Sequence, residues 1–102
     1  NTSRITIPTG QEGFYVFWGG IRYDANATGD RWLWFRLNGT TYMNRDEEPA
    51  AAGAKLLQVT TLYQMAAGDY VELMTHQTSG GNLDVTVAGN YSPEFACSYL
   101  HP

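Results

Sequence analysis

The chain has few of the features that mark several large classes of protein. It contains one cysteine, Cys97, so no internal disulfide can form and packing must supply the stability. It has no apolar run long enough to span a bilayer and no signal-peptide pattern at its start. Charged residues make up 16% of the chain and the net charge is −4, which argues against a nucleic-acid-binding surface. Its 102 residues are enough for a single domain with one core.

Helical periodicity is also absent, and short strand-like runs fill the chain instead. Gly, Pro, Asn and Asp separate these runs, a pattern typical of a β-sandwich or barrel. The one helix candidate, "EEPAAAGAKLL", is broken by Pro49 and Gly53. The expected strands are Arg4–Ile7, Phe14–Tyr23, Trp32–Leu37, Thr40–Arg45, Lys55–Met65, Tyr70–Gln77, Leu83–Ala88 and Phe95–Leu100.

The alternation of side chains separates these strands into two kinds. Trp32–Leu37 and Tyr70–Gln77 each have one apolar face and one mixed face, as expected of half-buried strands. Phe14–Tyr23 and Lys55–Met65 are apolar on both faces. An antiparallel sheet normally leaves one face to water, so a sheet that is apolar on both faces must be covered on both. In a domain this small we expect the second cover to be another subunit.

Four motifs, in order along the chain, resemble one family. "GFYVFWGGIRY" resembles the G-x-Y-x-F strand of the complement C1q and tumour necrosis factor jelly-roll superfamily, and "RLNGTTYM" is similar to its strand–NG–strand hairpin. "LLQVTTLYQMAAGDYVELM" resembles an apolar strand, a Gly-Asp turn and the next strand, and "SPEFACSYL" the closing Ser-x-Phe strand. The resemblance runs from about Gly13 to Leu100. It implies an all-β, antiparallel β-sandwich jelly roll, one domain over residues 1–102, assembled as a homotrimer.

The resemblance also implies which strands pack around the threefold axis. By position, Phe14–Tyr23, Lys55–Met65 and Phe95–Leu100 would form the inner sheet. The trimer-interface residues that it implies are Val16, Trp18, Gly20, Gln58, Thr60, Leu62 and Phe95. The family's first strand has no match before Arg4, so we expect it upstream in a longer chain, of which this domain is the C-terminal head.

The particular stretch "RITIPTGQEGFYVFWGGIRYDANATGDR" is most similar to the C-terminal head domains of phage minor tail proteins. Such heads lie at the tip of a trimeric fibre. The resemblance therefore implies a receptor-binding role and a location on a virion tail or outside the cell.

A candidate ligand surface follows from the Asn-Gly pair at 38–39, which predicts a two-residue type I′ turn. That register places Trp34 opposite Met43 and Trp32 opposite Arg45. With the strand 70–77 beside them, the expected outer face carries Trp32, Trp34, Arg36, Met43, Arg45, Tyr70 and Glu72. Aromatic rings flanked by hydrogen-bonding groups are suited to stacking the apolar faces of sugars. The alternative is that a loop or an N-terminal extension covers the rings.

Candidate metal and catalytic groups are few. The acidic residues at 46–48, together with Asp24 and Asp30, lack the ligand spacing of a calcium loop and are interpreted as solvated loop charges. Cys97 with His76 is the one pairing of a nucleophile with a base, and Cys97 lies in the middle of an expected strand. We therefore expect no enzyme activity, no metal and no cofactor.

The expected function is a non-enzymatic, trimeric head that binds a host cell-surface glycan through three linked sites. Two alternatives stay open, a secreted complement-like or cytokine-like module that binds a protein, and a structural cap that trimerises a fibre. N-glycosylation sequons matter for the secreted alternative alone; they lie at Asn1, Asn26, Asn38 and Asn90.

Overall fold

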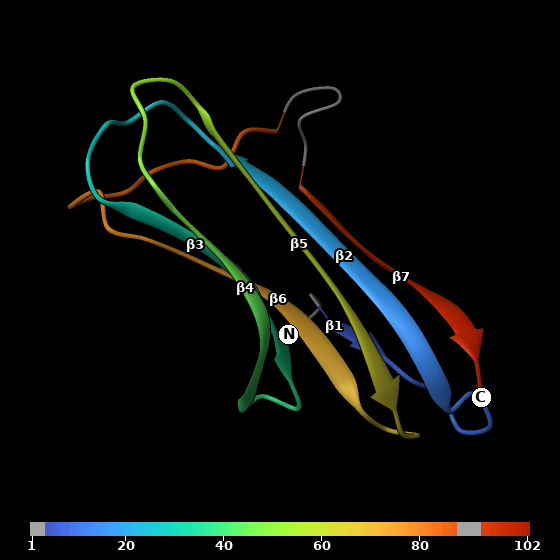
Figure 1. Cartoon of the computed structure of the whole chain (residues 1–102). Helices are drawn as coiled ribbons and strands as arrows, with labels where there is room; N and C mark the ends of the chain where they lie inside the picture. The colour runs from blue at the N-terminus through green and yellow to red at the C-terminus, as the bar shows by residue number, and fades with distance from the viewer. Residues whose placement is uncertain (1–3, 88–92) are drawn as a thin grey trace.

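The computed structural model describes residues 4–87 and 93–102, in which seven strands form two antiparallel sheets (Figure 1). One sheet has the strand order β1-β6-β3-β4 and the other β5-β2-β7. The expected all-β class and antiparallel β-sandwich are therefore confirmed. The strands are β1 (Arg4–Thr6), β2 (Gly13–Tyr23), β3 (Asp30–Leu37), β4 (Thr41–Pro49), β5 (Lys55–Met65), β6 (Tyr70–Gln77) and β7 (Glu94–His101).

The three-stranded sheet contains the three strands that the resemblance grouped together. β2 lies at its centre and pairs with β5 along its full length, from Gly13 opposite Met65 to Tyr23 opposite Lys55. β7 pairs along the other edge of β2. Figure 1 shows β5, β2 and β7 running side by side across the molecule. The set of strands expected in this sheet is thus confirmed.

The core lies between the two sheets. Because successive side chains of a strand point to opposite faces, alternate residues of β2 and β3 meet in the interior. Phe17 of β2 and Phe35 of β3 are both fully buried, and their ring centroids lie 6.0 Å apart. The buried core consists of Ile7, Tyr15, Phe17, Ile21, Tyr23, Leu33, Phe35, Leu37, Met43, Leu57, Val59, Met65 and Val71.

The β3–β4 hairpin has the predicted turn but a different register. Asn38 and Gly39 have positive φ angles of 52° and 76°, as a type I′ turn requires, and the Thr40 N–H donates to the Leu37 carbonyl at 3.1 Å. Leu37 pairs with Thr41, however, so Thr40 is an additional loop residue. The first side chains of β4 therefore point to the opposite faces from those predicted.

This one-residue difference moves Met43 from the predicted outer face into the core. Met43 pairs with Phe35 and is only 5% exposed, so its assignment to the ligand surface is wrong. Asn44, with a φ of 42°, then lies at a bulge where the register shifts between Trp34 and Phe35. The extra residue restores the predicted alternation, and Arg45 returns to the outer face opposite Trp34.

The expected strand Leu83–Ala88 does not form over residues 83–87, and Ala88 lies outside the described residues. The segment makes one isolated bridge, between Tyr23 and Val85, flanked by two backbone hydrogen bonds. β7 pairs along the same edge of β2 from Phe14 to Gly20. Only the end of β2 is left for residues 83–87, which is too short for a strand.

Phe95 faces the core, and its assignment to the trimer interface is therefore corrected. It pairs with Gly19, which is an inward position of β2, whereas Ala96 pairs with the outward Trp18. The Phe95 ring centroid lies 6.0 Å from that of Phe35. The alternation of β7 is thus shifted by one residue from the predicted one.

Candidate functional site

The outward face of the three-stranded sheet, called here the apolar face, carries the other residues assigned to the trimer interface. They are Val16, Trp18, Gly20, Gln58, Thr60 and Leu62. Trp18 lies at the centre of this face, between Thr60 of β5 and Ala96 of β7. The structure brings these six residues together on one surface.

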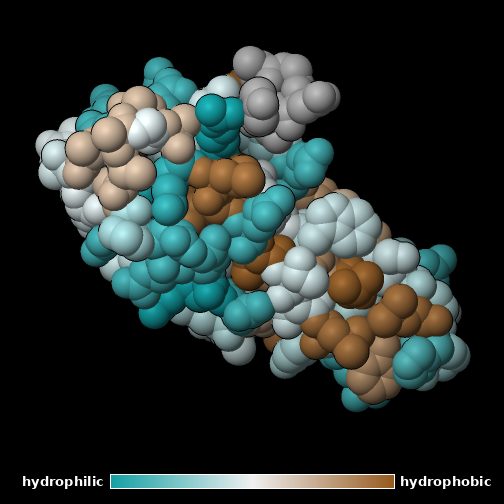
Figure 2. Space-filling view, turned by 45° about the horizontal axis from the view of Figure 1, so that its top comes forward, coloured by the Kyte–Doolittle hydropathy of each residue, from teal (hydrophilic) through white to brown (hydrophobic). Residues whose placement is uncertain are grey.

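Large hydrophobic side chains of the apolar face are exposed. Trp18 is 40% exposed, Leu62 58% and Leu56 55%. In Figure 2, apolar side chains gather at the lower right, over the ends of β5, β2 and β7. The outward face of an antiparallel sheet is usually polar, and a contiguous apolar patch on it marks an interaction surface.

The outward face of the four-stranded sheet, called here the mixed face, combines aromatic rings with charged side chains. It holds six of the seven residues that the sequence assigned to a ligand surface. These are Trp32, Trp34, Arg36, Arg45, Tyr70 and Glu72. It also holds Tyr42 and His76, which pair with Arg36 and Trp32. Tyr42 was missed because the hairpin register predicted from the sequence placed it on the inner face.

A buried ion pair lies near one end of the mixed face. Arg36 donates from Nε and Nη2 to Oε1 of Glu72 at 3.1 and 3.0 Å, and Glu72 is only 4% exposed. The backbone of Arg4 of β1 lies opposite that of Glu72 in the strand register, and the Arg4 guanidinium lies 4.0 Å from the centroid of the Tyr70 ring. A buried carboxylate needs such partners, because desolvation without them is very unfavourable.

Trp34 lies beneath another ring in the middle of the mixed face. Its ring centroid is 5.4 Å from that of Tyr42, and the planes are tilted by 39°. Trp34 is only 9% exposed, whereas Tyr42 is 63% exposed. The outermost aromatic surface of this region is therefore the tyrosine ring, and the tryptophan supports it from below.

Trp32 is half-buried under neighbours on both sides. The His76 ring centroid lies 5.0 Å away, and the Arg45 guanidinium lies 5.7 Å from the indole centroid. Arg45 also forms an exposed ion pair with Glu47 at 3.1 Å. In the part of the chain that the structure describes, the indole N–H groups of Trp32 and Trp34 have no hydrogen-bond acceptor.

The groups considered for catalysis lie apart. Cys97 packs against the core from β7, and burial raises the pKa of its thiol, which disfavours the reactive thiolate. His76 stacks on Trp32 at the mixed face of the other sheet. The two side chains therefore do not share a site. Among residues 4–87 and 93–102, no group of three or more His, Cys, Asp or Glu side chains is placed to hold a metal ion.

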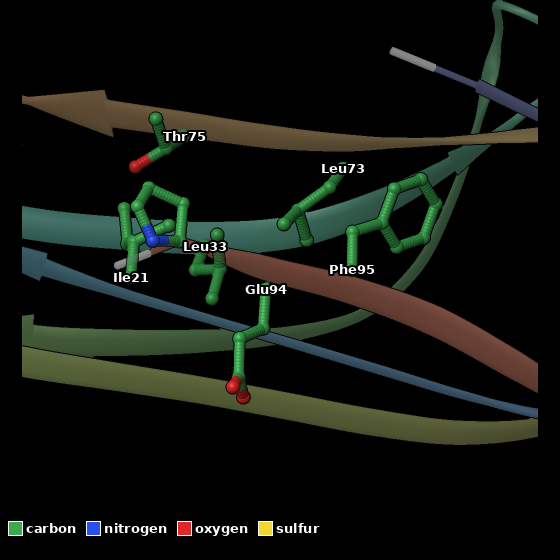
Figure 3. Close-up of a pocket in the computed structure, with 7 residues that line it drawn as sticks. Ile21, Leu33, Leu73, Thr75, Glu94 and Phe95 are labelled. Atoms are coloured by element: carbon green, nitrogen blue, oxygen red, sulfur yellow. The ribbon is translucent and has the colours of Figure 1, made fainter. Parts of the chain in front are cut away.

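A cavity of about 320 Å³ opens between the sheets near β6 and β7 (Figure 3). Its lining residues are Ile21, Leu33, Leu73, Thr75, Pro93, Glu94 and Phe95. In Figure 3 the Glu94 carboxylate points away from the apolar side chains. The Thr75 hydroxyl already donates to the Trp32 carbonyl at 2.7 Å and bonds the Tyr23 hydroxyl at 2.8 Å. The cavity therefore offers an apolar surface with little free hydrogen-bonding capacity.

Comparison of the chain with family models, with curated proteins and with solved structures found no match. None of the described residues belongs to a helix that is long and apolar enough to cross a membrane.

Proposed function

We propose that this domain is a non-enzymatic receptor-binding head that assembles as a jelly-roll homotrimer. The apolar face forms the contacts between subunits, and the mixed face binds a host cell-surface glycan. The motifs that resemble phage minor tail proteins support a location at the tip of a virion tail.

The observation that carries this proposal is the exposure of the apolar face. Trp18 projects from the central strand of its sheet and is 40% exposed, although both neighbouring strands are in place. Burying this surface between subunits removes a large apolar area from water, at about 25 cal/mol per Å². In a homotrimer, the apolar face of each subunit is covered by the equally apolar faces of its neighbours.

The mixed face suits a saccharide because it offers a flat exposed ring beside hydrogen-bond donors. The Tyr42 ring is exposed and lies on Trp34, so little side-chain entropy is lost when a ligand stacks on it. The neighbouring guanidinium groups can donate to sugar hydroxyls. Three such sites on one rigid trimer would bind a repetitive surface together, with apparent affinity raised by about 10²–10⁴ over one site.

The experiment that tests assembly is light scattering during size-exclusion chromatography. We expect the wild-type chain to elute with three times the monomer mass. We expect Trp18→Glu to elute as a monomer, because a carboxylate cannot be buried unpaired at the centre of a subunit contact. Circular dichroism of the variant shows whether its β-structure is retained.

Tyr42→Glu is the matched control, because it places the same charge at an exposed aromatic position on the other sheet. It should remain trimeric. A wild-type monomer at all concentrations, a dimer, or dissociation by both substitutions alike would contradict the proposed assembly. A trimer that binds no saccharide would instead favour a structural cap or a protein-binding module.

A further inference from the structure

Half of the cationic side chains of this acidic protein lie on the mixed face. The chain has six Lys and Arg residues against ten Asp and Glu residues. Three of the six lie on this face, and they are Arg4, Arg36 and Arg45. Two acidic residues of the face, Glu47 and Glu72, form ion pairs with Arg45 and Arg36. With Asp30 at the start of β3, the face carries as many arginines as carboxylates, whereas the chain as a whole has an excess of acidic residues.

A ligand can displace Glu47 from its ion pair with Arg45. The side chains of Arg45 and Glu47 are 48% and 45% exposed, so water screens their attraction. Exposed pairs of this kind contribute at most about 1 kcal/mol. A ligand carboxylate can therefore replace Glu47 with little loss of stability.

Arg36 is held in a fixed orientation by a carboxylate that lies below the surface. Glu72 accepts from its Nε and Nη2, while 31% of the Arg36 side chain stays exposed. A guanidinium has five N–H donors in a planar fork. The pair therefore orients Arg36 and leaves donor capacity for a bound acid.

The exposed phenol ring of Tyr42 lies on the same face as these two arginines. Tyr42 pairs with Arg36 across β3 and β4, and its ring covers Trp34, which pairs with Arg45. Neighbouring positions on one face of a strand are about 7 Å apart. A sugar ring stacked on Tyr42 would thus have an arginine at the neighbouring position along β4 and another across from it on β3.

We propose that the saccharide recognised by the mixed face is anionic, a pyranose that carries a carboxylate. Its apolar C–H face stacks on Tyr42, and its carboxylate binds Arg45 and Arg36. Arginine and carboxylate form strong charge-assisted hydrogen bonds of matching geometry. This inference rests on the proposed function, since it names the chemical class of the glycan.

The test is isothermal titration of the full chain with matched acidic and neutral sugars. The two pairs are trigalacturonate with its methyl ester, and sialyllactose with lactose. We expect an acidic member to bind at least about tenfold more tightly than its neutral partner. Its affinity should fall severalfold when sodium chloride is raised, because salt screens exposed charges.

Arg45→Gln should weaken binding of the acidic sugar at least about fivefold and remove the preference for acid over neutral. Tyr42→Ala should weaken binding as well. Lys55→Gln is the charge-matched control on the other sheet, and it should change the affinity less than about twofold. Equal losses in Arg45→Gln and Lys55→Gln would overturn the assignment of Arg45.

Two further outcomes separate this inference from the proposed function. If neutral and acidic sugars bind equally, the inference fails while the glycan-binding head stands. If no sugar of either kind binds a chain that light scattering shows to be trimeric, both the inference and the glycan assignment fail. Binding of an acidic peptide in place of every sugar would also overturn it.

Discussion

Arg31 is a fully buried cation at the start of β3. Its guanidinium donates to the carbonyls of Asn26, Thr28 and Asp30 at 2.9, 2.9 and 3.0 Å, and lies 5.7 Å from the centroid of the Tyr23 ring. The carbonyl dipoles replace the water that the charge lost on burial. These three hydrogen bonds also fix the conformation of the loop that connects β2 to β3. Its sequence position gives no sign of this role, because arginine in an alternating strand is normally placed on the exposed face.

The same loop contains a glycine that the backbone requires. Gly29 has a φ of +81°, and a Cβ there would overlap the backbone carbonyl of Thr78. Gly10 has a similar φ of +88° but has open space around its Cβ position. Alanine at Gly10 introduces only the strain of a positive φ, whereas alanine at Gly29 adds a steric clash with Thr78. Comparing the two variants therefore separates these two contributions to the loss of stability.

We expect Gly10→Ala to lower the free energy of unfolding by about 1–2 kcal/mol, the cost of a positive φ for an L-residue. Gly29→Ala should cost about 2–4 kcal/mol, because the loop must also move away from Thr78. Urea unfolding of both variants at one protein concentration measures the difference. Equal losses would show that the contact with Thr78 is easily relieved.

At the scale of strands, prediction succeeded for β2, β5 and β6, in which the alternation is unbroken. The bounds of β5 and β6 agree with the predicted Lys55–Met65 and Tyr70–Gln77. The outward residues of β2 and β5 were also placed correctly, because a misplaced strand of eleven residues would bury several polar side chains.

Prediction failed where the register depends on one irregular residue. The loop residue Thr40 shifts the start of β4 and the bulge at Asn44 restores the predicted alternation. Neither residue has a sequence signature as clear as the Asn-Gly turn. This error exchanged Met43 for Tyr42 on the mixed face. β7 follows Pro93 with no turn motif to fix its alternation, so Phe95 was placed on the wrong side. The two candidate surfaces were thus predicted on the correct sheets, but Met43 and Phe95 were wrongly assigned to them.

The bulged segment of β4 also has a positive role, since this strand covers the edge of β5. Asn44 donates from Nδ2 to the Thr60 carbonyl at 2.5 Å, and Oδ2 of Asp46 accepts from the Gln58 N–H at 3.0 Å. Unpaired groups at a sheet edge invite pairing with other chains, and side chains that occupy them prevent it. The bulge therefore connects the two sheets along this edge.

We expect Asp46→Ala to increase the hydrogen-exchange rate of the Gln58 amide at least about tenfold, because the amide loses its acceptor. Exchange monitored by NMR at each amide measures this. Glu47→Ala is the control, since Glu47 pairs with Arg45 on the mixed face and does not contact the edge of β5. An unchanged rate at Gln58 in Asp46→Ala would show that another group protects that amide.

At the scale of the whole molecule, the sandwich is elongated and thin. Its principal extents are 46 × 29 × 22 Å, and its radius of gyration is 14.8 Å, against about 13 Å for a compact domain of this length. Both sheets therefore present broad outward faces, and the core between them is one layer thick. A small core of this kind gains much from additional burial between subunits.

We expect the midpoint of thermal unfolding to rise with protein concentration, by several degrees between about 1 and 100 μM, because association stabilises the folded state by mass action. Trp18→Glu should abolish this dependence and lower the midpoint at high concentration. Differential scanning calorimetry over the concentration range measures both. A midpoint that is independent of concentration in the wild-type chain would contradict stabilisation by assembly.

The apolar face and the mixed face belong to different sheets and share no residue. Packed sheets lie about 10 Å apart, and substitutions separated by such a distance usually have additive effects. On the proposed assignment of the two faces, substitutions at Tyr42 or Arg45 should therefore change ligand binding without changing assembly, and substitutions at Trp18 or Leu62 should do the reverse. Ligand choice and oligomerisation could then evolve as separate traits, each on its own side of one short domain.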